Sequence, residues 1–325
     1  MSVNPPSNGS SVEKTAASPL SLSLGGIEFP SVLLNASGAF NAPLFNRLFP
    51  LHATLGGIVT KTVTREPQIG NQQPRTIELP GIGMLNSIGL QNPGLAYSLE
   101  TDLPALAAFH LPILLSISAH SSGEFAQMAE AILTHPSASQ VNALELNLSC
   151  PNVEKGGVHF GSAPESVRQA LQAVTTVWKK PVFAKLTPNV TDIAAVGEAA
   201  LEGGAFGLTA INTVLGVAID IKARKPVMPR ISAGYSGPGI KPVALHAIWN
   251  LHRRFPKVPI IGVGGIASTE DALEFLMAGA SLIQLGTSCF RQPMAFQKIA
   301  EGLQTFCATE NIQQITDLTG CAHSC

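Results

Sequence analysis

Cys150 and the two asparagines beside it form the group in this sequence with the clearest capacity for catalysis. Cys150 follows an apolar run that ends at Asn147, and Asn152 comes two residues later. A thiolate is a base and a nucleophile, and the amides both donate and accept hydrogen bonds. A cysteine in such a place is more often a buried apolar side chain before a turn. The glycine-rich stretch at 154–161 is typical of a mobile lid, so we favour the catalytic interpretation.

Two lysines end apolar runs elsewhere in the chain. Lys61 closes the sequence GIVTK and Lys185 closes VFAK. Because a lysine is rarely buried without a partner, the two together indicate an anionic or electron-rich ligand. Each could instead form a structural salt bridge, which is less plausible for both than for one. A Schiff base on one lysine would leave the second unexplained.

Four asparagines lie at expected strand ends or in insertions. Asn86 falls in the segment MLNSIGLQNP and Asn212 ends the segment LTAIN, while Asn147 and Asn152 flank the cysteine. Neutral amides suit a flat ligand with alternating donors and acceptors, such as the edge of a pyrimidine or a flavin. Any one of them alone would be an ordinary turn residue.

Glycines follow the last two apolar runs, as Gly264-Gly265 and as Gly286-Thr287. Glycine lets the backbone come close to a ligand, and N–H groups after the seventh and eighth strands are the usual phosphate site of (β/α)8 barrels. The same glycines could simply serve tight strand-to-helix turns. The segment 36–38 (Ala-Ser-Gly) follows the first run and could contribute from the opposite side.

The elements that must position these groups are eight short apolar runs. The runs do not alternate polar with apolar residues, which is typical of strands buried on both faces in a parallel sheet. Most of the candidate groups lie at the end of a run or just after it. The runs are residues 32–34, 57–61, 113–117, 143–147, 182–185, 207–211, 260–263 and 282–285.

Helix patterns separate several of the runs. Residues 164–178 carry an apolar stripe, 191–201 starts on a capping residue, and 268–278 starts with a capping-box sequence. Alternating strands and helices predict an α/β fold, a (β/α)8 TIM barrel with long loop insertions at its C-terminal face. The insertions are 62–112 and 212–259. A doubly wound open sheet is the alternative, weakened because no G-x-G-x-x-G follows the first run.

Composition excludes several classes of protein. The 325 residues are 45% hydrophobic and 13% charged, with a net charge of −1. A binder of nucleic acid through bulk charge needs a basic face, and a membrane helix needs roughly 18 uncharged apolar residues in a row. Neither feature is present, and no secretory signal is visible. We therefore expect a cytoplasmic protein.

The two ends of the chain differ from the rest. Residues 1–19 predict a disordered tail, 20–305 the catalytic barrel, and 306–325 a loose C-terminal tail with free thiols. Cys307, Cys321, His323 and Cys325 match no metal-binding spacing, so we expect no metal site there.

Ten segments occur in an order that resembles the dihydroorotate dehydrogenase family of flavin enzymes. They are ASGAF, VTKTVT, GNQQPR, GMLNSIGLQNPG, ELNLSCPNV, VFAKLTPN, AINT, SGPGIKP, GVGGI and AGASLIQLGTS, and they span about residues 20–295. The resemblance implies FMN-dependent oxidation of dihydroorotate to orotate in pyrimidine biosynthesis. The cysteine of NLSCPN resembles class 1, and INTVLGVAIDIKARKP resembles the class 1B catalytic subunit.

The resemblance also implies roles for the residues. Cys150 is the expected general base, Lys185 is expected at the flavin N1/C2 carbonyl edge, and Lys61 between flavin and substrate. The expected substrate-binding residues are Lys61, Asn86, Ile88, Gly89, Leu90, Asn147, Asn152, Asn212 and Thr213. The expected FMN-binding residues are Ala36, Ser37, Gly38, Lys61, Thr62, Asn86, Asn147, Lys185, Ile211, Gly237, Gly264, Gly265, Gly286 and Thr287.

The resemblance leaves partners and some alternatives open. It implies a homodimer, or a heterotetramer with an iron–sulfur flavoprotein that passes electrons to NAD; the basic stretch 222–230 could meet such a partner. A class 1A enzyme using fumarate is one alternative, and a related flavin barrel that reduces another pyrimidine is a second. A non-redox barrel acting on a sugar phosphate, or a non-catalytic scaffold, would leave the asparagines unexplained. One departure is the sequence GYSGPG at 234–239, where the family reads GLSGPA.

Overall fold

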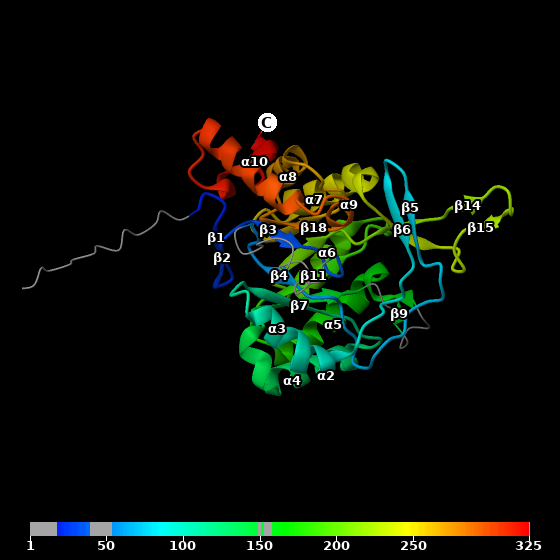
Figure 1. Ribbon diagram of the computed structural model, residues 1–325. Helices are drawn as coiled ribbons and strands as arrows, with labels where there is room; N and C mark the ends of the chain where they lie inside the picture. The colour runs from blue at the N-terminus through cyan, green and yellow to red at the C-terminus, as the bar shows by residue number, and fades with distance from the viewer. Residues whose placement is uncertain (1–17, 40–53, 149–150, 153–157, 325) are drawn as a thin grey trace, which may run out of the picture.

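The core of the protein is a closed barrel of eight parallel strands. The computed structural model describes residues 18–39, 54–148, 151–152 and 158–324. The strand order is β3-β18-β17-β12-β11-β8-β7-β4, and a parallel bridge between Leu34 and Gly57 brings the two edge strands together. The predicted (β/α)8 barrel is confirmed (Figure 1). The strands are β3 (Leu33–Asn35), β4 (Ile58–Val59), β7 (Ile113–Ile117), β8 (Ala143–Asn147), β11 (Val182–Leu186), β12 (Gly207–Ala210), β17 (Ile260–Val263) and β18 (Leu282–Leu285).

Helices cover the outside of the barrel and bury one apolar face each. The side chain of Ser268 accepts a hydrogen bond from the N–H of Asp271, completing the capping box of α8. The cap of α6 is Asp192, one residue later than expected. The longer helices are α4 (Ser122–Thr134), α5 (Pro164–Val177), α6 (Ile193–Glu202), α7 (Lys241–Arg254), α8 (Thr269–Met277) and α10 (Ala295–Thr309). Shorter ones are α2 (Leu95–Tyr97), α3 (Leu103–Ala107) and α9 (Ser288–Arg291).

The two long insertions combine into one antiparallel sheet. Strands β5 (Thr76–Leu79) and β6 (Gly83–Asn86) come from the first insertion, and β13 (Val214–Gly216) and β16 (Ala233–Ser236) from the second. Their order is β13-β16-β6-β5, so β16 and β6 join segments that are about 150 residues apart in the chain. Strand β6 thereby carries Asn86 to the same side as the barrel strand ends.

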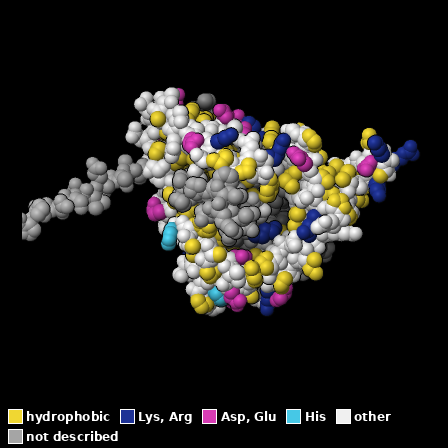
Figure 2. Space-filling view, in the orientation of Figure 1, with side chains coloured by type: hydrophobic (Ala, Val, Ile, Leu, Met, Phe, Trp, Pro, Cys, Tyr) yellow, Lys and Arg dark blue, Asp and Glu magenta, His cyan; other side chains and the backbone are white. Residues whose placement is uncertain are grey.

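The other strands of the described residues form three hairpins. Strands β14 (Ile219–Asp220) and β15 (Lys225–Pro226) form an arm that projects from the molecule, with lysine and arginine side chains at its end (Figures 1 and 2). The others are β1 (Leu22–Leu24) with β2 (Ile27–Phe29), and β9 (Pro151–Asn152) with β10 (Val158–His159).

The C-terminal segment is folded over residues 306–324, so the expectation of a loose tail is wrong there. Helix α10 continues to Thr309, and Cys307, Ile315 and Leu318 are buried. The N–H of Ile315 donates to the carbonyl of Pro19 at 2.8 Å. Apolar side chains at these positions give the segment enough buried surface to order it. Cys325 and residues 1–17 of the expected N-terminal tail lie outside the described residues.

No helix within the described ranges is long and apolar enough to cross a membrane. In the same ranges, no group of three histidine, cysteine or acidic side chains is arranged to hold a metal ion.

Candidate active site

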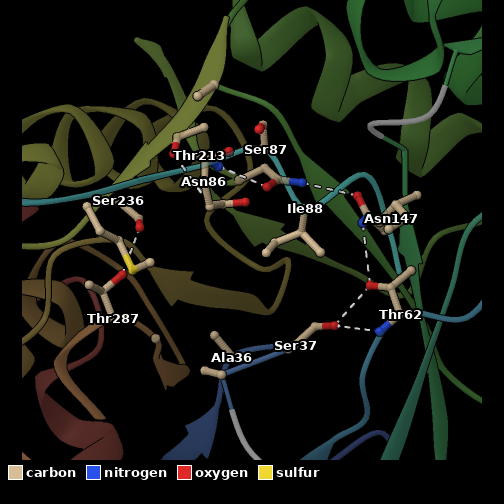
Figure 3. A pocket seen from close by; sticks show the side chains of 18 of the residues that line it. Ala36, Ser37, Thr62, Asn86, Ser87, Ile88, Asn147, Thr213, Ser236 and Thr287 are labelled. Carbon is tan, nitrogen blue, oxygen red and sulfur yellow. Dashed lines mark hydrogen bonds between the residues drawn. The ribbon is translucent and has the colours of Figure 1, made fainter. Parts of the chain in front are cut away.

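A cavity of about 1180 Å³ opens at the carboxyl ends of the barrel strands, beside the antiparallel sheet. Figure 3 shows side chains from the barrel and from the insertions turned toward it. Most of the residues that the sequence singled out line this one cavity. They are Ala36, Ser37, Gly38, Lys61, Thr62, Asn86, Ile88, Gly89, Leu90, Asn147, Lys185, Ile211, Asn212, Thr213, Gly237, Gly264, Gly265, Gly286 and Thr287.

Two of the predicted site residues are not placed at the cavity. Cys150 lies outside the described residues. Asn152 is placed through its backbone alone, which pairs with Val158 in the hairpin of β9 and β10. The roles expected for Cys150 and Asn152 therefore stay predictions.

A chain of hydrogen bonds links side chains from four different barrel strand ends (Figure 3). The amide of Asn212 donates to Asn147 Oδ1 at 3.1 Å, and the amide of Asn147 donates to Thr62 Oγ1 at 3.4 Å. Thr62 Oγ1 lies 2.9 Å from Ser37 Oγ. Because each amide is held by its neighbour, the orientation of the wall is fixed before a ligand arrives.

The two predicted lysines both reach the cavity but have different surroundings. Lys61 packs against Gly38, where an added Cβ would lie 3.4 Å from Lys61 Nζ. Burial, and secondly the charge of Lys185, lower the pKa of Lys61. Lys185 forms an ion pair with Glu145, with 3.5 Å between Nζ and Oε1. The salt-bridge alternative thus holds for Lys185, whereas Lys61 forms no ion pair with any described residue.

Glu145 is a buried residue of the site that the sequence interpretation missed. Its side chain is completely buried within the barrel, and its Oε2 accepts a hydrogen bond from Gln284 Nε2 at 2.8 Å. A glutamate in the middle of the apolar run ALELN was the available signal, because buried carboxylates occur almost only with a partner.

The glycines of one cavity wall have backbone conformations that only glycine adopts readily. Gly237, Gly264 and Gly265 have φ angles of 109°, 131° and 86°. An added Cβ at Gly265 would lie 2.7 Å from the backbone nitrogen of Lys241. Thr287 Oγ1 donates to Ser236 Oγ at 2.8 Å beside these glycines. Backbone and hydroxyl donors therefore gather after β17 and β18, where the sequence predicts a phosphate site.

The departure from the family sequence at 234–239 has a steric explanation. The hydroxyl of Tyr235 donates to the carbonyl of Ile82 at 2.9 Å. An added Cβ at Gly239 would lie only 1.9 Å from that hydroxyl oxygen. The tyrosine thus occupies the space of an alanine side chain at position 239, so the two departures compensate each other.

Fold and site together define a (β/α)8 barrel whose strand ends open into a cavity, with amide, hydroxyl and ammonium side chains along its walls. A family model described as dihydroorotate dehydrogenase matches residues 19–307. The chain belongs to the dihydroorotate dehydrogenase family and is an oxidoreductase.

Several curated relatives match most of the chain. A protein of Pelobacter propionicus is 41% identical over 93% of this chain and 97% of its own length. A protein of Geobacillus kaustophilus is 42% identical over 93% of this chain and 95% of its own length. A protein of Alkaliphilus metalliredigens is 40% identical over 93% of this chain and 98% of its own length. All three are named dihydroorotate dehydrogenase B (NAD(+)), catalytic subunit.

The residues at the cavity fit FMN. The glycine-lined wall leaves room for a phosphate, and Ser288 Oγ lies on this wall, buried and without a hydrogen-bond partner among the described residues. The Asn147–Asn212 amides and the two lysines supply the donors and acceptors that a flavin edge requires. Ser288 was not singled out from the sequence, since a serine after a glycine-threonine pair is unremarkable by itself.

Gly265→Ala should weaken FMN binding about tenfold or more, because the new methyl group must displace the backbone at Lys241. Gly26→Ala is the matched control, since Gly26 also has a positive φ of 76° but no atom within 4 Å of the added Cβ. Fluorescence titration of apoprotein with FMN measures both. Equal FMN affinity in the two variants would contradict the assigned phosphate wall.

Proposed function

We propose that this chain uses FMN to oxidise dihydroorotate to orotate in pyrimidine biosynthesis and passes the electrons to NAD through an iron–sulfur flavoprotein partner. The family match and the relatives named as NAD-linked catalytic subunits support this reaction. The observation that carries it is the meeting of two lysines, the hydrogen-bonded asparagines and the glycine wall at one cavity. We assign the catalytic barrel to residues 20–305.

In this proposal the substrate carboxylate binds near the ammonium of Lys61. Asn86, Asn147, Asn212 and Thr213 hold the pyrimidine ring, together with N–H groups of the segment 88–90. Asn152 belongs to the same set by its motif. The fixed amide chain orients the ring before reaction.

The proposed chemistry divides between the chain and its cofactor. Cys150 removes a proton from C5 of dihydroorotate as general base, a role that rests on the NLSCPN motif. FMN, when bound, supplies a hydride acceptor for C6. A free thiol titrates near pH 8.5, so removal of the proton is coupled to loss of the hydride or the thiol is tuned locally. Lys185 places a positive charge at the cavity floor, where reduction adds negative charge.

An electron-transfer partner needs a docking surface, for which we propose the arm of β14 and β15. Ile221 at its end is 84% exposed, and Lys222, Arg224 and Lys225 stand beside it. We propose a homodimer or a heterotetramer with that partner. Fumarate as acceptor and another pyrimidine as substrate are the alternatives, and the relatives' NAD-linked name favours neither.

The purified protein should be yellow and should bleach when dihydroorotate is added without air. Hydride transfer to FMN removes the visible absorption of the oxidised flavin, which absorbance spectroscopy follows. Dihydrouracil, which lacks the carboxylate, is the matched control substrate and should leave the colour unchanged. Reduction by dihydrouracil but not by dihydroorotate would overturn the proposal, and so would failure to bind flavin on reconstitution. Activity assays with fumarate, with NAD alone, and with NAD plus copurifying protein then identify the electron acceptor.

Cys150→Ala should keep FMN and orotate binding but lose about 10²–10⁴-fold in turnover at neutral pH, because the base is gone. Steady-state rates and spectral titration with orotate separate the two effects. Cys321→Ala is a suitable control, since Cys321 is an exposed free cysteine that does not line the cavity. Unchanged turnover in Cys150→Ala would remove Cys150 as the base.

Orotate affinity should fall as pH rises, and the fall should begin at a pH below about 10.4, which is the ordinary pKa of a lysine. The lowered pKa of Lys61 means that its ammonium loses the proton at a lower pH, and with it the attraction for an anion. Lys61→Gln should bind orotate weakly with no such pH dependence. An affinity in the wild-type protein that stays constant to pH 10 would contradict a role for Lys61 in binding the carboxylate.

A further inference from the structure

Glu145 lies one layer below the floor of the cavity. It precedes Asn147 by two residues on β8, so both side chains leave the strand on the same side. Asn147 lines the cavity, whereas Glu145 does not and has no exposed surface. Glu145 therefore acts on a ligand only through other side chains.

The carboxylate of Glu145 joins side chains from three other strands. Its Oε1 accepts from Lys185 Nζ on β11 and from Ser116 Oγ on β7, each at 3.5 Å. Its Oε2 accepts from Gln284 Nε2 on β18 at 2.8 Å. Lys185 is the cationic partner among these contacts, and its own side chain is 8% exposed. Both charges of the pair are thus removed from bulk water, where losing either partner is costly.

The surroundings of Lys185 otherwise oppose a positive charge. Lys61 is a second ammonium close enough to have its own pKa lowered by Lys185. The residues in register with Lys185 on its two neighbouring strands, Asn147 on β8 and Thr209 on β12, are neutral. Among the described residues, Glu145 is accordingly the anion paired with Lys185, and His120 is a titratable group that lines the same cavity. Without Glu145, the buried ammonium of Lys185 would have no counter-charge among the described residues and a second ammonium close by, which is a costly arrangement.

We propose that Glu145 is a positioning residue that keeps Lys185 protonated and directed at the cavity floor, so that an ammonium and not an amine meets the flavin. The proposal deepens the function above and rests on it. If Lys185 stays an ammonium at every working pH, it stabilises the reduced, anionic flavin to the same extent throughout that range. The 2.8 Å hydrogen bond from Gln284 holds the carboxylate of Glu145, and Glu145 in turn holds Lys185.

The test compares the reduction potential of bound FMN across pH in wild-type protein and in Glu145→Gln. In the variant, Lys185 takes up a proton when the flavin is reduced. Taking up one extra proton per two electrons changes the equilibrium constant for flavin reduction by a further tenfold per pH unit. The reduction potential should therefore fall more steeply with pH, by up to about 30 mV per unit. The curves should cross, because the lone ammonium at low pH stabilises reduced flavin better than the ion pair does. Parallel curves would overturn the proposal.

Two further variants separate charge from structure in the same measurement. Glu145→Asp keeps the carboxylate and should restore the wild-type slope. Ser116→Ala removes a neutral contact of the same carboxylate oxygen and should leave the slope unchanged. A steeper slope in Ser116→Ala, or a slope in Glu145→Asp like that of Glu145→Gln, would overturn the charge-based role.

A stability measurement decides the pairing even if Glu145→Gln folds poorly or the flavin assignment fails. Glu145→Gln and Lys185→Gln each leave one member of the buried pair without its partner, whereas the double variant removes both members. Thermal unfolding of the apoproteins should show the double variant to be more stable than either single variant. Additive losses would overturn the ion pair as the support of Lys185. Failure of wild-type protein to bind FMN would instead contradict the proposed function alone.

Discussion

The site depends on one geometric constraint, which is that the strands of a closed parallel barrel all end at the same rim. Asn147, Lys185 and Asn212 are far apart in sequence, yet their neighbouring strands bring them to one cavity. Because these strand ends are largely shielded from bulk water, their polar groups must find partners in one another or in a ligand. Asn212, Asn147 and Thr62 are partners of one another through hydrogen bonds. The cavity beside them leaves room for a ligand as a further partner.

Burying charge at such a rim has an electrostatic cost, which the carboxylate of Glu145 reduces by pairing with Lys185. Two ammonium groups lie close together in a poorly solvated space, and Glu145 offsets part of their repulsion from beneath. The remaining positive charge suits a ligand that carries a carboxylate and a flavin that becomes anionic on reduction. Family membership, cavity and charge thus agree on the oxidation of a small acidic pyrimidine.

The sequence predicts the barrel well because eight largely apolar runs alternate with helix patterns, and the open-sheet alternative lacks its glycine motif after the first run. The runs at 113–117, 143–147, 260–263 and 282–285 match observed strands at both ends. The antiparallel sheet in the insertions was not predicted, since β6 and β16 pair across about 150 residues and carry no local signal of that pairing. The folded C-terminal segment was missed for a similar reason: Ile315 and Leu318 are ordinary residues until the surface that buries them is known. Most of the candidate site residues could be read from strand-end positions, whereas Glu145 and Ser288 depend on contacts across the barrel.

A crystal structure of the protein soaked with FMN and orotate would show whether the cavity holds the flavin and the pyrimidine in this way. The account predicts flavin density in the cavity, with its phosphate against Gly265 and Gly286, its ring edge at Lys185, and the orotate carboxylate within hydrogen-bond distance of Lys61. Flavin density elsewhere on the barrel, or orotate bound with its carboxylate turned away from Lys61, would contradict it.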